Sequence, residues 1–206
     1  MKYVTIDTET TNLFDYRKPA DAEGQPRLAQ LALVFLAPDH TIEREVAFLI
    51  KPEGWTMSAE TAAIHGLTQE KLLAEGVPVL GALTAYNEAL DGEYIVVGYN
   101  VSYDLKVMRG ELRRAGLADR FETTRSVDCM RPLTSVCKIP KAKGNGYKLP
   151  KLVEAYRHLF NKDFDGAHGA PADAHACAEI FRHMVANNLL SEAHLSGLKE
   201  VKGSPT

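Results

Sequence analysis

The protein has 206 residues, a net charge of −3 and 45% hydrophobic residues. This composition is typical of one soluble α/β domain and argues against disordered and membrane proteins. No apolar run reaches the length of a membrane span and no signal peptide is evident, so we expect a cytoplasmic protein without membrane partners. The three cysteines form no C-x-x-C pair, which argues against a disulfide framework and a structural zinc site.

The first quarter of the chain predicts three consecutive strands. Residues 3–13, YVTIDTETTNL, begin as a buried strand and reach Asp7 and Glu9 where that strand should end. The polar loop NLFDYRKPADAEGQP follows. Two apolar segments, residues 27–36 and 44–50, flank the turn APDHT and predict an antiparallel hairpin beside the first strand.

The rest of the chain predicts helices that alternate with the strands YIVVGY and RSVDCM. Apolar residues at helical spacing, glycine stops and a proline at a helix start support these helices. The predicted helices span residues 58–76, 79–92, 100–117, 149–160 and 171–189. The helix at 149–160 carries an apolar stripe that we expect in the core, made of Leu149, Leu152, Val153, Tyr156, Leu159 and Phe160.

This order predicts an α/β fold in which helices cover a mixed five-stranded sheet. A three-strand antiparallel meander would be joined by two parallel strands. We expect one domain at residues 1–190 and a short C-terminal tail at residues 191–206, whose last residues, KEVKGSPT, look frayed.

A lysine-rich segment, KIPKAKGNGYKLPK at residues 138–151, holds five lysines and no acid. The pattern fits a solvated flexible loop and a phosphate-contacting loop equally well. The net charge of −3 counts mildly against a nucleic-acid binder, although cations held by carboxylates would add positive charge locally.

Four acids stand where they could meet at one site. Asp7 and Glu9 would project from the same face of a strand, roughly 7 Å apart along the backbone, which suits a cation; a lone D-x-E also marks a strand that leaves the core for solvent. Asp104 and Asp173 fall in the first turns of two helices, beside their apolar faces. First-turn acids commonly stabilise helix ends, but a carboxylate that faces inward needs a partner such as a metal.

His168 lies five residues before Asp173 in the segment AHGAPAD. The small residues around it would let the ring reach a site at the helix start, where it could take a proton from water. A simply exposed histidine is the alternative. Of the other histidines, only His65 has comparable surroundings.

Four segments resemble a known family. IDTETTNL, VVGYNVSYD and HGAPAD are similar to the three motifs of the DEDDh, or DnaQ-like, 3′-to-5′ exonuclease superfamily, and AAIHGLT resembles its I-H-G-[IL]-T stretch. They occur in the family's order, between residue 3 and about residue 190. The superfamily includes the proofreading (epsilon) subunit of bacterial DNA polymerase III, ribonuclease T and oligoribonuclease. The resemblance implies a ribonuclease-H-like fold.

The resemblance also implies a mechanism. Asp7, Glu9, Asp104 and Asp173 would hold two divalent cations, Mg²⁺ or Mn²⁺, which suit oxygen ligands. His168 would be the general base for an in-line attack by water, and a nucleoside 5′-monophosphate would leave.

Six residues are implied as substrate contacts. By resemblance, the terminal nucleotide would lie against Thr10, Thr11, Leu13, His65, Asn100 and Tyr103. Two departures stand out: Asn12 replaces a frequent glycine, where positive φ would be needed, and Tyr99 and Tyr103 replace His and Phe.

The sequence therefore predicts a metal-dependent 3′-to-5′ exonuclease that acts on single-stranded or frayed 3′ ends. DNA is favoured over RNA because GYKLPKLVEAY resembles polymerase-associated members, and the expected role is proofreading or repair. A DNA polymerase partner and the oligomeric state are left open. The alternatives are an RNA-trimming exoribonuclease, a catalytically idle nucleic-acid-binding scaffold, and another enzyme of ribonuclease-H-like fold.

Overall fold

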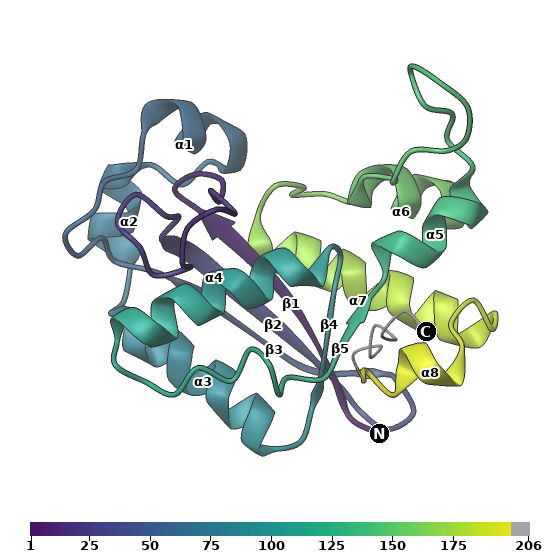
Figure 1. Ribbon diagram of the computed structural model, residues 1–206, viewed down its shortest axis with the longest axis horizontal. Coiled ribbons are helices and arrows are strands. Elements are labelled where there is room, and N and C mark those ends of the chain that lie inside the picture. The colour runs from purple at the N-terminus through teal and green to yellow at the C-terminus, as the bar shows by residue number, and fades with distance from the viewer. Residues whose placement is uncertain (199–206) are drawn as a thin grey trace, which may run out of the picture.

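The computed structural model describes residues 1–198, built around one mixed five-stranded sheet (Figure 1). The strand order is β3-β2-β1-β4-β5. The pairs β1/β2 and β2/β3 are antiparallel, and β1/β4 and β4/β5 are parallel, which confirms the predicted fold class. The strands are β1 (Tyr3–Thr10), β2 (Leu28–Leu36), β3 (Ile42–Leu49), β4 (Ile95–Gly98) and β5 (Ser126–Asp128).

Helices cover both faces of the sheet, as Figure 1 shows. On one face, Val4 and Ile6 of β1 pack with apolar residues of α3 and α4; on the other, Tyr3 of β1 packs with α5, α6 and α7. The helices are α1 (Ala59–His65), α2 (Gln69–Glu75), α3 (Val79–Asp91), α4 (Val101–Arg114), α5 (Met130–Cys137), α6 (Leu152–Phe160), α7 (Ala170–Ala186) and α8 (Glu192–Leu195).

Three details differ from the sequence predictions. The helix expected at residues 58–76 is divided into α1 and α2 at Gly66, whose φ of 72° ends the first helix. Helix α5 was not predicted, because its eight residues contain a proline and are too few for a clear apolar period. Leu149, expected in the core stripe, lies before α6 and is 46% exposed, whereas Tyr156 of that stripe is buried.

The segment predicted as a tail begins with ordered structure. The Tyr3 hydroxyl donates to the Leu195 carbonyl at 3.1 Å, and the Ser126 N–H donates to the Gly197 carbonyl at 2.8 Å. These bonds fasten α8 and the residues after it to β1 and β5. Residues 199–206, where a frayed end was expected, lie outside the described residues, and the domain division at residue 190 stays a prediction.

Two expectations from composition can be checked. Cys129, Cys137 and Cys177 are buried free thiols, as expected. Among the helices of residues 1–198, none combines the length and apolar character that a membrane crossing requires.

A buried carboxylate fixes the loop that follows β1. Glu111 of α4 is 1% exposed and accepts hydrogen bonds from Arg27 Nε at 2.8 Å, Arg114 Nη1 at 3.1 Å and the Leu28 N–H at 3.1 Å. The Ala20 carbonyl of the same loop lies so close to Gly110 that a Cβ there would come within 2.6 Å. The loop is therefore clamped onto α4, next to the carboxyl end of β1.

Replacing Glu111 with Ala should lower the free energy of unfolding by about 3 kcal/mol, because two partly buried guanidinium groups lose their carboxylate. Urea denaturation measures the change. Glu88→Ala, on the exposed face of α3, is the matched control and should stay within about 0.5 kcal/mol of the wild type. A loss for Glu111→Ala as small as that of the control would show that the clamp does not stabilise the fold.

Candidate active site

The alternation of side chains along β1 sends its acids to one face of the sheet. Asp7 and Glu9 share the face of Thr5, whose hydroxyl donates to the Ala174 carbonyl of α7 at 2.8 Å. Thr8 points to the opposite face, toward α4. The acids lie within the strand rather than at its end, because β1 continues to Thr10 after a register shift between Glu9 and Thr10.

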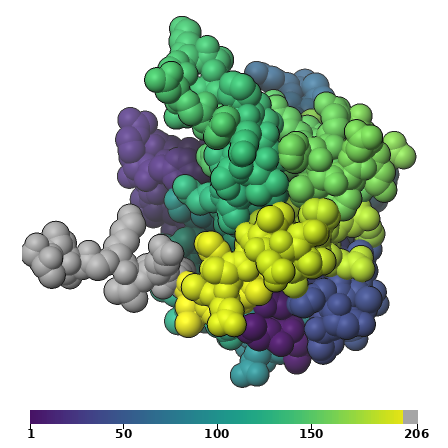
Figure 2. Space-filling model, turned by 90° about the vertical axis from the view of Figure 1, so that its right-hand side faces the viewer, coloured from purple at the N-terminus to yellow at the C-terminus, as the bar shows by residue number. Residues whose placement is uncertain are grey.

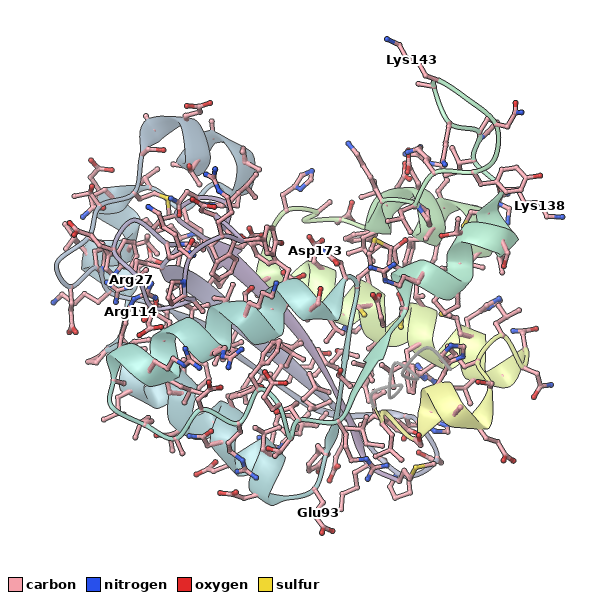
Figure 3. All side chains as sticks on the ribbon, in the orientation of Figure 1. Arg27, Glu93, Arg114, Lys138, Lys143 and Asp173 are labelled. Atoms are coloured by element: carbon pink, nitrogen blue, oxygen red, sulfur yellow. The ribbon has the colours of Figure 1, made fainter. Side chains whose placement is uncertain are left out.

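The start of α7 brings a third carboxylate to Asp7 and Glu9. Gln30 lies opposite Glu9 on β2, and its Oε1 accepts the Ala170 N–H at 3.1 Å, which fastens the first residue of α7 to the sheet. Asp173 follows in the first turn of this helix. One carboxylate oxygen from each of Asp7, Glu9 and Asp173 lies within 4.8 Å of the others. Figure 3 shows Asp173 at the end of the sheet where these elements meet.

Asp104 lies behind this cluster on α4. It is 5% exposed, and its Oδ1 accepts the Thr8 hydroxyl at 2.8 Å. Asn100, in the left-handed conformation with φ of 71°, precedes the helix, and its N–H donates to Asp128 Oδ1 at 3.1 Å. The structure thus brings three of the four predicted acids together and places the fourth beside them.

Burial raises the pKa of all four acids when no cation is present, and repulsion within the cluster adds to the shift at Asp7 and Glu9. Burial, followed by the charges of the other three acids, raises the pKa of Asp7 well above its ordinary value. Burial, with Asp173 and Asp104 adding, raises the pKa of Glu9 to about 8. Burial also raises the pKa of Asp104 to about 7 and that of Asp173 to about 6.

The cluster has the properties of a site for a hard divalent cation. Its donors are all carboxylate oxygens, the ligand class that such cations prefer. Asp173 Oδ1 is buried and has no hydrogen-bond partner among residues 1–198. Since an unpaired buried polar atom is costly, a cation ligated there would compensate both this atom and the repulsion between the acids.

His168 stands at the entry to α7, beside Asp173. Its side chain is exposed, and its backbone is left-handed, with φ of 69°. The backbone N–H of His168 and the charge of its ring both lower the pKa of Asp173, whereas burial raises it. The histidine is therefore near the acid cluster and accessible to solvent, as the predicted proton-transfer role requires.

A cleft of about 280 Å³ opens next to Glu9. Two apolar side chains on its walls are unusually exposed, Leu13 at 82% and Ile64 at 63%. Four of the six predicted substrate contacts line it, namely Thr10, Leu13, His65 and Tyr103. Thr11 and Asn100 lie outside this cleft: the Thr11 hydroxyl accepts the Arg27 N–H at 3.0 Å, and Asn100 directly precedes α4.

The departures at Tyr99 and Tyr103 add hydrogen bonds. Asn12 is not among the residues with positive φ, so the turn does not need the glycine-like conformation that was considered. Instead its carbonyl accepts the Tyr103 hydroxyl at 3.1 Å and the Thr10 hydroxyl at 2.9 Å. The Tyr99 hydroxyl donates to the Pro150 carbonyl at 2.9 Å. Phenylalanine at position 103 would lose the first of these bonds.

Sequence reasoning missed the residues that hold the acids in place. Thr8, Gln30 and Asp128 all bond to a segment that carries a site residue. A signal existed for Gln30, because it is the one polar residue in the apolar strand β2, LAQLALVFL. For Asp128, no spacing in the sequence relates the short strand β5 to the start of α4.

Comparison with known families decides the affiliation. Residues 4–181 match the family RNase_T, described as exonuclease. The chain belongs to this exonuclease family. The predicted DEDDh, DnaQ-like superfamily of 3′-to-5′ exonucleases is thereby confirmed, as is the expectation of an exonuclease enzyme. The closer resemblance to the epsilon subunit stays a prediction, and the comparison with curated protein sequences gives no match.

Solved structures of exonuclease I share the fold of this exonuclease domain. E. coli exonuclease I in complex with a dT13 oligonucleotide superimposes with a TM-score of 0.70 at 17% identity, over 89% of this chain and 40% of that one. The zinc-bound E. coli complex with single-stranded DNA gives 0.69 at 18%, over 90% and 40%. Exonuclease I from Methylocaldum szegediense gives 0.71 at 21%, also over 90% and 40%. The chain therefore spans about 40% of the length of these structures.

In metal-free buffer, the free energy of unfolding should fall as pH rises from about 5 to about 8. The raised pKa values of Asp7, Glu9, Asp104 and Asp173 mean that the native state binds more protons than the unfolded chain in this window, so stability is lost as these groups ionise. Denaturation in EDTA measures the fall, and millimolar Mg²⁺ or Mn²⁺ should remove most of it at pH 8.

Glu9→Gln removes one titrating group and should flatten this pH dependence, whereas Glu88→Gln should leave it unchanged. Metal-free stability that is constant or rises across the window would contradict the assignment of a repelling carboxylate cluster.

Proposed function

We propose that the protein is a metal-dependent 3′-to-5′ exonuclease that releases nucleoside 5′-monophosphates from single-stranded or frayed 3′ ends of DNA. The observation that carries the proposal is the convergence of Asp7, Glu9 and Asp173, with ligand oxygens within 4.8 Å of one another, in a chain of the exonuclease family. An idle scaffold has no physical need for such a cluster, because the acids repel one another without a cation.

The four acids have distinct places in the proposed chemistry. Asp7, Glu9 and Asp173 would hold one divalent cation, and Asp7 together with Asp104 would hold a second. Bound there, two cations stabilise the attacking and leaving oxygens of an in-line displacement at phosphorus. The hydrogen bond from Thr8 to Asp104 fixes one carboxylate oxygen and leaves the other for this role.

His168 takes the proton of the attacking water. An imidazole is suited to this step because its pKa lies near the working pH, and the exposed side chain beside Asp173 is accessible to water. The left-handed backbone at His168 turns the chain immediately before α7, whose first turn holds Asp173, and this supports a shared role for the two residues.

The cleft beside Glu9 receives the terminal nucleotide. The exposed side chains of Leu13 and Ile64 offer apolar surface to a base, and the Thr10, Tyr103 and Asn12 hydrogen bonds make the cleft wall rigid. Burial lowers the pKa of His65, which favours the neutral form of this ring in the cleft.

DNA is the proposed substrate because the similar E. coli exonuclease I structures hold a dT13 oligonucleotide and single-stranded DNA, one of them with a zinc ion. A role in proofreading or repair, and a DNA polymerase as partner, belong to the same proposal.

The first test is digestion of 5′-labelled single-stranded DNA and RNA of one sequence, with Mg²⁺, with Mn²⁺ and with EDTA. We expect a metal-dependent ladder that shortens from the 3′ end, faster on DNA. Asp7→Ala should abolish the ladder because a shared cation ligand is lost, while Glu88→Ala should retain it. Full turnover by a folded Asp7→Ala protein would rule out the proposed cation site. Faster digestion of RNA would show that RNA, and not DNA, is the preferred substrate.

His168→Ala should lower kcat about 100-fold or more, as expected when a general base is removed. The variant should keep the stabilisation by Mg²⁺ seen in thermal denaturation, because the acid cluster is intact. His158→Ala, an exposed histidine on α6, is the control and should turn over at the wild-type rate. If both variants are equally active, His168 has no part in the chemistry.

A further inference from the structure

A lysine-rich hairpin stands out from the fold between α5 and α6 (Figure 1). We call residues 138–151 the basic arm. Pro140 pairs with Tyr147, the Lys148 N–H donates to the Ile139 carbonyl at 2.9 Å, and the Lys141 N–H donates to the Gly146 carbonyl at 3.1 Å. The hairpin is thus held together by its own backbone hydrogen bonds.

The tip of the basic arm packs against nothing. Residues 140–147 are all exposed, and a Cβ added at Gly144 or Gly146 would meet no atom within 4 Å. Figure 2 shows the arm projecting from the top of the molecule. A segment of this kind does not stabilise the fold by burying surface, so its lysine-rich composition is not explained by packing.

The charge of the basic arm is unopposed at its tip. Lys148 forms an ion pair with Glu154 of α6 at 2.5 Å, which anchors the base of the arm. Within residues 1–198, no ion pair is formed by Lys138, Lys141 or Lys143. Figure 3 shows Lys143 at the tip and Lys138 at the base, both directed away from the protein.

An aromatic side chain accompanies these lysines. Tyr147 is 46% exposed, although its position in the hairpin would allow any polar residue. Unpaired cations next to an exposed aromatic ring are the combination that binds single-stranded nucleic acid, since the cations contact phosphates and the ring stacks on a base.

The position of the basic arm relates it to the active site. Tyr99 directly follows β4, and its hydroxyl donates to the Pro150 carbonyl, so the base of the arm is bonded to the connection that leads from β4 to Asp104. In Figure 1, α1, which forms one wall of the terminal-nucleotide cleft, and the basic arm both rise above the end of the sheet where β1 ends, α1 at the left and the arm at the right. A strand whose end lies in the cleft and whose last phosphodiester lies over the acids would continue toward the arm.

We propose that the basic arm binds the phosphodiester backbone and a base of the single strand upstream of the scissile bond. Lys141 and Lys143 contact phosphates, and Tyr147 stacks on a base. The inference rests on the proposed function for the direction of the strand, and it adds a binding site some nucleotides away from the chemistry.

The experiment compares the binding of 5′-labelled single-stranded DNA of 4 and 20 nucleotides by fluorescence anisotropy in EDTA, where no turnover occurs. Lys141→Ala/Lys143→Ala should weaken binding of the 20-mer about tenfold and reduce the slope of log K against log salt by about 1.4, at about 0.7 for each phosphate contact. Tyr147→Ala should weaken it about fivefold or more through lost stacking. Binding of the 4-mer should not change.

The matched control is Lys51→Ala/Lys71→Ala, which removes the same charge from exposed positions outside the arm and should leave 20-mer binding within twofold of the wild type. The inference is overturned if the arm variants bind the 20-mer with wild-type affinity and salt slope, or if they weaken 4-mer and 20-mer binding equally. Failure of the wild type to digest any strand would refute the proposed function instead, and the binding comparison would still decide the role of the arm.

Discussion

The site depends on the two-residue alternation of side chains along β1. Asp7 and Glu9 point to the face covered by α7, while Thr8 between them points to the face covered by α4. One strand therefore serves two helices, each of which supplies an acid from its first turn. A shift of register by one residue would turn Asp7 and Glu9 to the other face and take them away from Asp173.

Holding like charges together requires a frame that is stable without them. Two hydrogen bonds contribute to it, Thr5 to α7 and Gln30 to the first residue of α7, and a third, from Thr8, holds Asp104 itself. The apolar clusters on the two faces of the sheet, with Ile6 on one and Ala174 on the other, supply the burial that stabilises the frame. The same burial raises the pKa of each acid, so stability of the scaffold and readiness to bind a cation arise from one arrangement.

Much of this arrangement could be predicted from the sequence because its strongest signals are local. The apolar runs of β1, β2 and β4 and the helical periods of α4 and α7 predicted these elements correctly. Asp104 and Asp173 fall in line with the apolar residues of their helices, and this predicted that both acids face inward. Long, regular elements carry enough residues for a period to be evident.

The remainder depends on contacts between distant segments. Gln30 bonds to a residue that follows it by 140 positions, and Asp128 bonds to the start of a helix that precedes it along the chain. Leu149 has the apolar character of a core residue, but it lies in the connection between the basic arm and α6. Its exposure is set by the path of this connection, which the helical spacing of apolar residues does not reveal. Gly66 divides a segment of uniform helical composition through one left-handed residue.

The residues that follow α8 also affect the exposed edge of the sheet. An outermost strand normally presents unpaired N–H and C=O groups that can recruit a strand from another molecule. On one side this strand is β5, which has three residues and whose Ser126 N–H is already bonded to Gly197. On the other side, β3 carries the exposed charges of Glu43, Arg44 and Glu45. Both borders of the sheet thus discourage edge-to-edge aggregation, one by a short, capped strand and the other by charge.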